Sequence, residues 1–232
     1  MLKTRKKKKT IQNTGSKSQC QCSSRCKNPQ VDGSMFCTLH HGSCVRVSPL
    51  SGSEPRYNPD YWNKNFKLKE THNCFAYAFN INDPKQIKRC VSEDCDVPFH
   101  QPGMVSGYSK FSQRRPKTCP NMMARLIGDN PSIKMATFTE RCPVGTSKIA
   151  LVVDPDEDYH FLRQDSNALW SHKPGARKVT NLDASGKHIY DPALANHNWK
   201  AANNNSDLDY DMFCSYMCVP RNKAVKLRTR KY

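Results

Sequence analysis

The sequence predicts an α+β domain in which a short amino-terminal helix packs on an antiparallel sheet. Three observations predict this class. The segment "CFAYAFN", residues 74–80, supplies apolar residues for one face of a short helix. Strand-like segments follow one another between residues 147 and 220, and turn residues separate them. An early helix followed by such a run of strands is typical of α+β folds.

The first elements of this domain follow from their ends and their composition. Thr118 with Pro120 just inside predicts a helix start, and Gly128 predicts its stop. Residues 147–154, "SKIALVVD", are rich in β-branched residues and predict a buried strand. A turn at residues 154–157 then leads to a second strand, "DYHFLRQD".

The remaining strands are predicted by turns. A turn at Ser166-Asn167 precedes a third strand in "LWSHK", and another turn is centred on Ser185-Gly186. The segment "YDMFCSYMCVP", residues 210–220, closes the predicted sheet.

We predict five regions along the chain. Residues 1–19 form a disordered basic arm, and residues 20–44 a Cys- and His-rich module. Residues 45–69 are a Pro- and Asn-rich linker, residues 70–220 the α+β domain, and residues 221–232 a basic tail.

The formal net charge of +17 is concentrated at the two ends. Six positive charges lie within residues 3–9 and six within residues 221–231, which leaves +5 for residues 10–220. Basic tails of this kind neutralise phosphates or dock on acidic protein surfaces. They predict nucleic acid or neighbouring proteins of an assembly as partners, and a solubilising or nuclear-targeting role is the alternative.

The first residues do not resemble a signal peptide, because "MLKTRKKKKT" is not followed by an apolar segment. The aliphatic run Ile149–Val153 is too short to span a bilayer. We therefore expect synthesis in the cytoplasm, a reducing compartment. Twelve cysteines there indicate metal ligation, a catalytic thiol, or oxidation after release from the cell.

Cys74 lies at the predicted start of the short helix, which Asn73 or Thr71 can cap. A thiol at a helix start has a lowered pKa, and a histidine beside it makes a nucleophile. His160, on the predicted second strand, is the preferred base. His172 would lie on the side of His160 if the turn after Asp165 has three residues, and on the opposite face if it has two. The alternative bases are His72, His100, His172, His188 and His197, and the alternative orienting groups are Gln164, Asp183 and Asp191.

The segments "NCFAYAF" and "DYHFLRQD" resemble the permuted papain-like amidases and peptidases, notably the cysteine–histidine-dependent amidohydrolases. Together with "SPLSGSEPRYNPDYWNKN", "HQPG", "LWSHKPG" and "DASGKHIYDP", they resemble a group encoded by large nucleocytoplasmic DNA viruses, with shorter relatives in phages and bacteria. The resemblance covers residues 45–220.

This resemblance implies a papain-like thiol-hydrolase fold, a viral origin, and Cys74 and His160 at the matching positions. The expected function is that of a virion-associated protein that cleaves peptide or amide bonds. The alternative is a non-enzymatic minor capsid protein that docks on neighbouring capsid proteins or nucleic acid through its tails and Cys-rich module.

The spacing of cysteine and histidine residues in the amino-terminal module predicts a structural zinc site. Cys22 and Cys26 form one short ligand pair, and Cys37 and His40 form the second after ten residues. Cys20 could replace Cys22, and Cys44 or His41 could complete another set. A disulfide cluster is the alternative.

The other cysteines leave two interpretations open. Cys90, Cys95, Cys119 and Cys142 could bind a second metal with His100, or form two disulfides. Cys214 and Cys218 are predicted to share one strand face, too far apart to bridge each other.

Overall fold

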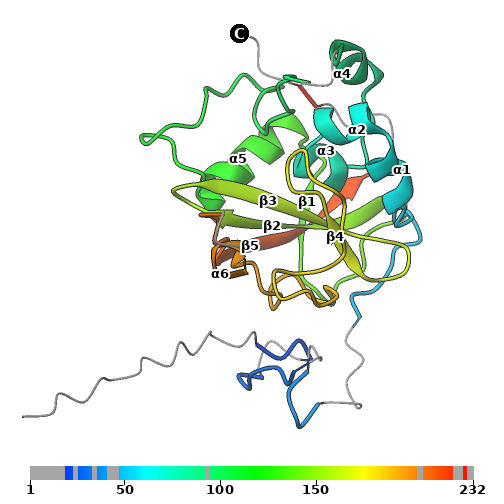
Figure 1. Ribbon diagram of the computed structural model, residues 1–232, viewed down its shortest axis with the longest axis vertical. Coiled ribbons are helices and arrows are strands. Elements are labelled where there is room, and N and C mark those ends of the chain that lie inside the picture. The colour runs from blue at the N-terminus through cyan, green and yellow to red at the C-terminus, as the bar shows by residue number, and fades with distance from the viewer. Residues whose placement is uncertain are drawn as a thin grey trace, which may run out of the picture.

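The computed structural model describes residues 19–22, 26–32, 36–40, 47–91, 95–202, 206–221 and 227–228. Within these ranges the chain is α+β, with one antiparallel sheet (Figure 1). The coarse fold class predicted from the sequence is confirmed. The predicted basic arm lies almost entirely outside the described residues, as does most of the basic tail.

The five strands lie in the order β1-β5-β2-β3-β4. They comprise β1 (Lys134–Ala136), β2 (Thr146–Asp154), β3 (Asp158–Gln164), β4 (Trp170–His172) and β5 (Met212–Pro220). The four strands predicted from β-branched content and turns therefore form. The short edge strand β1 was missed, because three residues carry too little periodicity to identify a strand.

Six helices are described: α1 (Pro59–Lys64), α2 (Phe66–Thr71), α3 (Cys74–Ala78), α4 (Pro84–Arg89), α5 (Cys119–Asp129) and α6 (Trp199–Ala202). Helix α5 starts at the predicted Thr118 cap and continues one residue past the predicted stop at Gly128. Helix α1 and most of α2 lie in the segment predicted as a linker. Asn58 and Asn65 accept hydrogen bonds from the first turns of these helices, so the asparagines there are caps.

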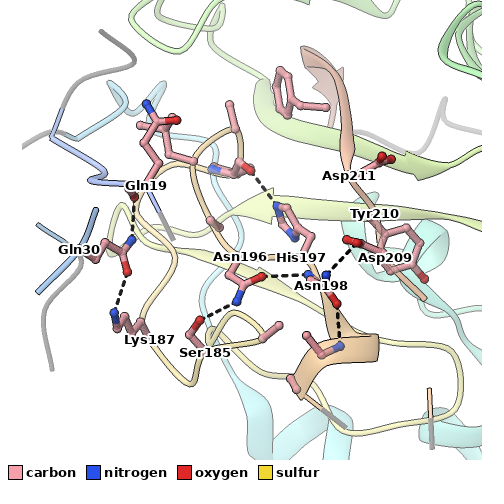
Figure 2. A pocket seen from close by; sticks show the side chains of 18 of the residues that line it. Gln19, Gln30, Ser185, Lys187, Asn196, His197, Asn198, Asp209, Tyr210 and Asp211 are labelled. Atoms are coloured by element: carbon pink, nitrogen blue, oxygen red, sulfur yellow. Dashed lines mark hydrogen bonds between the residues drawn. The ribbon is translucent and has the colours of Figure 1, made fainter. Parts of the chain in front are cut away.

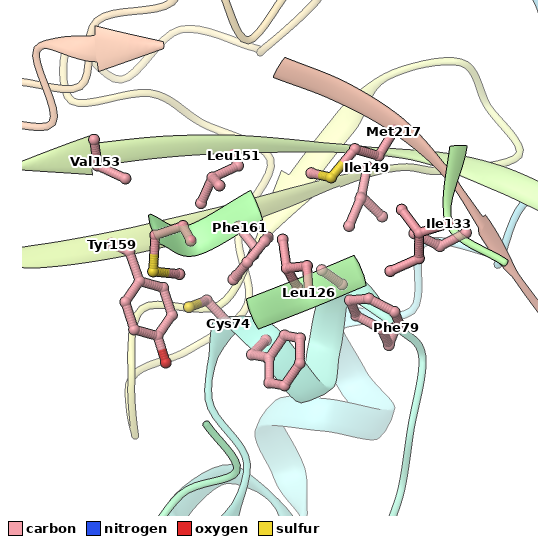
Figure 3. Packing of buried hydrophobic residues seen from close by; sticks show 14 residues of the cluster. Cys74, Phe79, Leu126, Ile133, Ile149, Leu151, Val153, Tyr159, Phe161 and Met217 are labelled. Atoms are coloured by element: carbon pink, nitrogen blue, oxygen red, sulfur yellow. The ribbon is translucent and has the colours of Figure 1, made fainter. Parts of the chain in front are cut away.

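Strand β2 is buried on both faces, because its alternate residues pack into two different clusters. Ile149, Leu151 and Val153 face α3 and α5, as Figure 3 shows. Ala150 and Val152 face the other side, where Trp170 is completely buried. The helices α1–α5 lie on the first side in Figure 1, and α6 lies on the second.

A β-bulge in β5 places its two cysteines on opposite faces. Leu151 pairs with Ser215, but the next residue, Val152, pairs with Phe213, so Cys214 is the extra residue. Cys214 packs against the cluster under α5 and is bonded to Cys119, whereas Cys218 is bonded to Cys142. The prediction that Cys214 and Cys218 share one face is wrong, because strict alternation fails at a bulge.

Three disulfides have both partners in the described residues: Cys90–Cys95, Cys119–Cys214 and Cys142–Cys218. All four cysteines of the predicted second metal site are therefore in disulfides, so that site with His100 does not form. Only Cys90 and Cys95 pair within the predicted set, because Cys119 and Cys142 are bonded to the two cysteines of β5. His100 instead pairs with Asp83, with His100 Nε2 at 3.3 Å from Asp83 Oδ2. Two of the bridges fasten β5 to segments far away in the chain.

Arg163 and Asp165 form a buried ion pair where β3 meets the helical layer, with Arg163 Nε at 2.9 Å from Asp165 Oδ1. The guanidinium also lies over the Tyr77 ring and donates to Asn80 Oδ1. With several partners around one charge, the group is stabilised although it is removed from water. It fixes α3 against the sheet, which positions Cys74.

Candidate functional site

Cys74 is the first residue of α3 and lies against the sheet (Figure 3). Asn73 caps the helix by accepting from the Ala76 amide, as predicted, and its side-chain amide donates to the His100 carbonyl. Cys74 is only 5% exposed. Burial and then the neighbouring Asp158 carboxylate raise the pKa of Cys74 to about 12.

His160 and His172 are brought together by the pairing of β3 with β4. Leu162 lies opposite His172, which is the register that a three-residue turn predicts. His160 Nε2 lies 2.8 Å from His172 Nδ1, and both rings are buried. His172 is therefore on the side of His160, and the register follows from the turn after Asp165.

The hydrogen bonds of this pair fix the tautomers of both rings. A carbonyl oxygen only accepts, so His172 Nε2 carries the proton that is donated to the Leu182 carbonyl at 2.9 Å. In its neutral form His172 then accepts at Nδ1, and His160 donates from Nε2. The remaining nitrogen of His160, Nδ1, is consequently a hydrogen-bond acceptor.

Burial keeps both histidines neutral. It lowers the pKa of His160 well below its ordinary value, with a further contribution from His172. It lowers the pKa of His172 to about 4. The raised pKa of Cys74 and the lowered pKa of His160 both act against a thiolate–imidazolium pair, the state on which nucleophilic catalysis by cysteine depends.

Cys74 and His160 line one pocket of about 800 Å³. Asp158, at the start of β3, also lines it, and the Tyr210 hydroxyl lies 3.3 Å from Asp158 Oδ2. Phe99, Tyr159 and Trp199 add aromatic surface. Sequence reasoning missed Asp158 and Tyr210, although the alternation of β3 places Asp158 on the same face as His160.

The other candidate orienting groups are occupied elsewhere. Gln164 donates to the Ser48 carbonyl, Asp183 accepts from the Ser185 and Lys187 amides of the predicted turn, and Asp191 accepts from the Tyr216 hydroxyl.

Three of the alternative histidines have other partners in the fold. His72 Nε2 accepts from the Asp83 amide, and His197 Nε2 donates to the Pro192 carbonyl. His188 forms an isolated bridge with Leu182.

The amino-terminal module gathers four metal-ligating side chains: Cys20, Cys26, Cys37 and His40. Their ligand atoms all lie within 4.8 Å of one another. His40 Nδ1 is 3.4 Å from the sulfurs of both Cys20 and Cys37. Cys22, the predicted ligand, is disulfide-bonded, so Cys20 takes its place as the alternative set anticipated. His41 and Cys44 lie outside the described residues.

The sulfur atoms of this cluster interact strongly. Cys26 Sγ and Cys37 Sγ are 3.7 Å apart. Burial acts to raise the pKa of Cys37, but hydrogen bonds from Cys20 and Asn28 outweigh it, so the pKa is about 6. The pKa of the neighbouring Cys26 is raised, so Cys37 is the more readily deprotonated of the two, and the thiolate is the form that binds a metal ion.

The module docks on the segment that carries the turn at residues 183–187. The Gln21 side chain accepts from the Tyr190 and Asp191 amides, each at 3.2 Å. Lys187 Nζ donates to Gln30 Oε1 at 2.7 Å (Figure 2). The same segment includes Leu182, whose carbonyl accepts from His172 Nε2. One segment therefore contacts both the amino-terminal module and the histidine pair.

A second pocket of about 660 Å³ lies at this junction (Figure 2). Its polar side chains are mostly paired with one another: Asn196 donates to Ser185 Oγ, and Asn198 donates to Asp209. These bonds hold the junction together and leave few free polar groups for a ligand.

Comparison with known proteins identifies one whose sequence is similar to that of this chain. The chain is 34% identical over 141 residues to insoluble matrix shell protein 1 of Ruditapes philippinarum. The match covers 60% of this chain and 80% of the relative. The chain belongs to the family of insoluble matrix shell protein 1. No model of a known protein family matches the sequence, and no solved structure matches the chain.

This membership corrects the function predicted from the sequence. The assignment to a virion-associated hydrolase, or alternatively to a minor capsid protein, is wrong, as is the virion localisation. The short segments around Cys74 and His160 suggested that assignment, whereas the family relationship rests on 141 aligned residues. Among the described residues no helix has the length and hydropathy needed to cross a membrane.

Proposed function

We propose that this chain is a structural component of an insoluble protein matrix. The observation that carries the proposal is the similarity to insoluble matrix shell protein 1, which extends over 80% of that protein. The disulfides that fasten β5 support it, because disulfides persist in oxidising surroundings outside the reducing cytoplasm.

Electrostatics indicates what kind of partner such a matrix requires. A chain with a net charge of +17 repels its own copies and stays soluble by itself. Its incorporation into an insoluble material therefore needs an anionic partner that neutralises the basic ends. We infer an acidic protein for this role, and a nucleic acid would meet the same electrostatic requirement.

Co-sedimentation with polyaspartate tests this proposal. We expect the chain to sediment with the polymer at low salt and to return to the supernatant as NaCl is raised, because exposed charge pairs are screened. Replacing Lys3 and Lys6–Lys9 by glutamine should weaken sedimentation. The matched variant with arginine at the same five positions keeps the charge and should sediment like the natural chain. Equal sedimentation of the glutamine and arginine variants would contradict the role of the arm.

We also propose that the cluster of Cys20, Cys26, Cys37 and His40 binds zinc. Zinc–sulfur bonds of about 2.3 Å in a tetrahedron place two sulfurs about 3.8 Å apart. The separation of 3.7 Å between Cys26 Sγ and Cys37 Sγ fits this geometry. Zinc would order a segment that is too short to have a hydrophobic core of its own.

Metal content measured after gel filtration tests the zinc site. We expect one zinc per chain, lost in Cys20→Ser and retained in Cys22→Ser, since Cys22 belongs to a disulfide. Zinc retained in Cys20→Ser would refute the proposed ligand set.

We further propose that the domain has a papain-like fold, as the resemblance implied. The support is a cysteine at the first residue of α3, packed on an antiparallel sheet that carries His160 and His172 on neighbouring strands. The proposal concerns the fold alone. An experimental structure in which α3 and the strands β2 to β4 do not superpose on a papain-like domain would refute it.

A further inference from the structure

Arg125, in the second half of helix α5, is a buried cation whose N–H groups have no acceptor among the described residues. Only 1% of the residue is exposed, and its Nε is buried without a hydrogen-bond partner. Two aromatic rings hold the guanidinium: Arg125 Cζ lies 4.0 Å from the ring centroid of Phe111 and 5.1 Å from that of Tyr108. Rings attract the cation, but they leave its donors without an oxygen to accept from them.

The carboxylate best placed in the sequence to pair with Arg125 is used elsewhere. Asp129 lies four residues further along α5, the usual spacing of a helical ion pair. Its oxygens are occupied, because Oδ2 accepts from the Gly103 amide at 2.6 Å and Oδ1 from the Ser106 amide at 2.8 Å. Burial lowers the pKa of Arg125, with a further contribution from Arg115, and Asp129 opposes this only in part. A buried cation in this situation gains from an anion in direct contact.

The position of the guanidinium is fixed by Gly103. This glycine ends the segment "HQPG", residues 100–103, and has a φ of +88°. A Cβ atom there would lie 2.9 Å from Arg125 Cγ and 3.1 Å from Arg125 Nη1, so the arginine occupies space that only glycine leaves open. Between this loop and the two rings the side chain is held in one place, and a group held in this way loses less entropy when it binds a ligand.

Arg125 lines a pocket of about 330 Å³ in which all the charges are positive. Lys110 is the other charged residue of the lining, and no aspartate or glutamate of the described ranges contributes to it. Gln101 Oε1 accepts from the Tyr159 hydroxyl at 2.5 Å, so the Gln101 side chain has its N–H donors left for a ligand. Ser109 adds a hydroxyl. An anion that accepts hydrogen bonds complements this set.

The remaining walls indicate that the anion is carried on an apolar stem. They are formed by Pro98, Phe99, Pro102, Met104 and Phe111. The guanidinium fork binds a carboxylate through two parallel N–H bonds, and apolar walls pack against the methylene groups beside it. An inorganic anion has no methylene group for these walls. The volume is at the lower end of the range for ligand pockets, which suits a single side chain.

We propose that this pocket binds the carboxylate of a glutamate or aspartate side chain from an acidic partner protein, with Arg125 as its main contact. The inference rests on the proposed matrix function, which requires an anionic partner for the basic ends. Part of the predicted basic tail adjoins the pocket, because the Gln101 amide donates to the Arg228 carbonyl at 3.2 Å. The net charge of +17 attracts an acidic chain, and the pocket adds a specific contact to this general attraction.

Nuclear magnetic resonance of the isotope-labelled full chain tests the pocket, with the Nε–H signal of Arg125 as the readout. The signal is assigned by its absence in Arg125→Met. The probes are Nα-acetyl-glutamate N-methylamide and its uncharged analogue Nα-acetyl-glutamine N-methylamide. We expect the glutamate probe to shift the signal and to bind at least about tenfold more tightly, since hydrogen bonds to charged groups give at least that factor. Inorganic phosphate should bind more weakly than the glutamate probe, because it cannot use the apolar walls.

Two lysine variants separate the pocket from general charge attraction. Lys110→Gln removes an exposed charge at the pocket and should weaken binding of the glutamate probe by about two- to fivefold. Lys200→Gln is the matched control, because it removes an exposed charge from α6, on the other side of the sheet, and should bind like the natural chain (Figure 1). Arg125→Met, checked for a natural melting temperature, should bind the glutamate and glutamine probes equally.

Equal affinities of the glutamate and glutamine probes for the natural chain would overturn the proposal, as would phosphate binding as tightly as the glutamate probe. A loss in Lys200→Gln as large as that in Lys110→Gln would also overturn it. None of these outcomes alters the dependence of polyaspartate co-sedimentation on the arm lysines. Conversely, loss of co-sedimentation with glutamate binding intact would refute the matrix partner and leave the pocket, so the two failures are distinguishable.

Discussion

Removing the disulfide between Cys119 and Cys214 should lower the free energy of unfolding, and the size of the loss depends on whether the Cys142–Cys218 disulfide is intact. The two cysteines are 95 residues apart, and loop-closure entropy for such a loop gives about 4.7 kcal/mol. However, Cys142–Cys218 already joins the same regions. With that bridge intact, the extra loop contains only the 119–142 and 214–218 segments, about 27 residues, which reduces the effect to about 3.5 kcal/mol.

The assay is guanidinium denaturation of Cys119→Ala/Cys214→Ala without reductant, followed by tryptophan fluorescence. The matched control is Cys90→Ala/Cys95→Ala, whose cysteines are 5 residues apart. Loop entropy gives about 2 kcal/mol for that removal. We expect the free energy of unfolding to fall more for the long loop than for the short one. A larger loss in the Cys90/Cys95 variant would refute the assignment of the stabilisation to loop closure.

Two further predictions follow from buried charges. Unfolded histidine titrates near pH 6.5, whereas burial lowers the pKa values of His72 and His172 to about 4. Between pH 6.5 and pH 4 the unfolded state therefore binds more protons than the folded state. The free energy of unfolding is highest above pH 6.5 and falls as the pH drops to 4, by about 3 kcal/mol per histidine. Asp165, whose pKa burial raises, offsets part of this loss. Denaturation at pH 7 and pH 4.5 measures the change, and equal free energies would contradict it. Arg163→Ala should cost about 3–5 kcal/mol, because it leaves Asp165 buried without its cation; the thermal midpoint of that variant, compared with Lys64→Ala at an exposed ion pair, is the measurement.

The strands and their order of appearance could be predicted because their patterns are local. The register of β3 with β4 stayed open, since it depends on whether the turn after Asp165 has two or three residues, but β-branched residues identified β2. The α5 helix was likewise predicted from its cap and its proline. These features depend on neighbouring residues, which is why one sequence was sufficient.

Other features depend on contacts between distant segments. The bulge at Cys214 reverses the face of the strand beyond it, and no turn or glycine in the segment indicates it. The choice of Cys20 over Cys22 depends on how the module folds back to His40. The function was mispredicted because it was inferred from short segments around Cys74 and His160, whereas the family relationship that corrects it rests on 141 aligned residues. Such a relationship appears only when two whole sequences are compared.

The unpaired thiols provide the clearest check on this view of Cys74. Among the described residues the free cysteines are Cys20, Cys26, Cys37 and Cys74. A chain with several disulfides can keep free thiols only if they are protected, since thiolates are the reactive form. In the module a metal ion would give this protection, whereas at Cys74 burial gives it by raising the pKa to about 12. Alkylation of the native protein at pH 8 should therefore leave all four unmodified. A chelator should expose the three thiols of the module, and only denaturant should expose Cys74. If Cys74 reacts first in the native protein, burial does not control its chemistry, and the assignment of an unreactive thiol to this pocket fails.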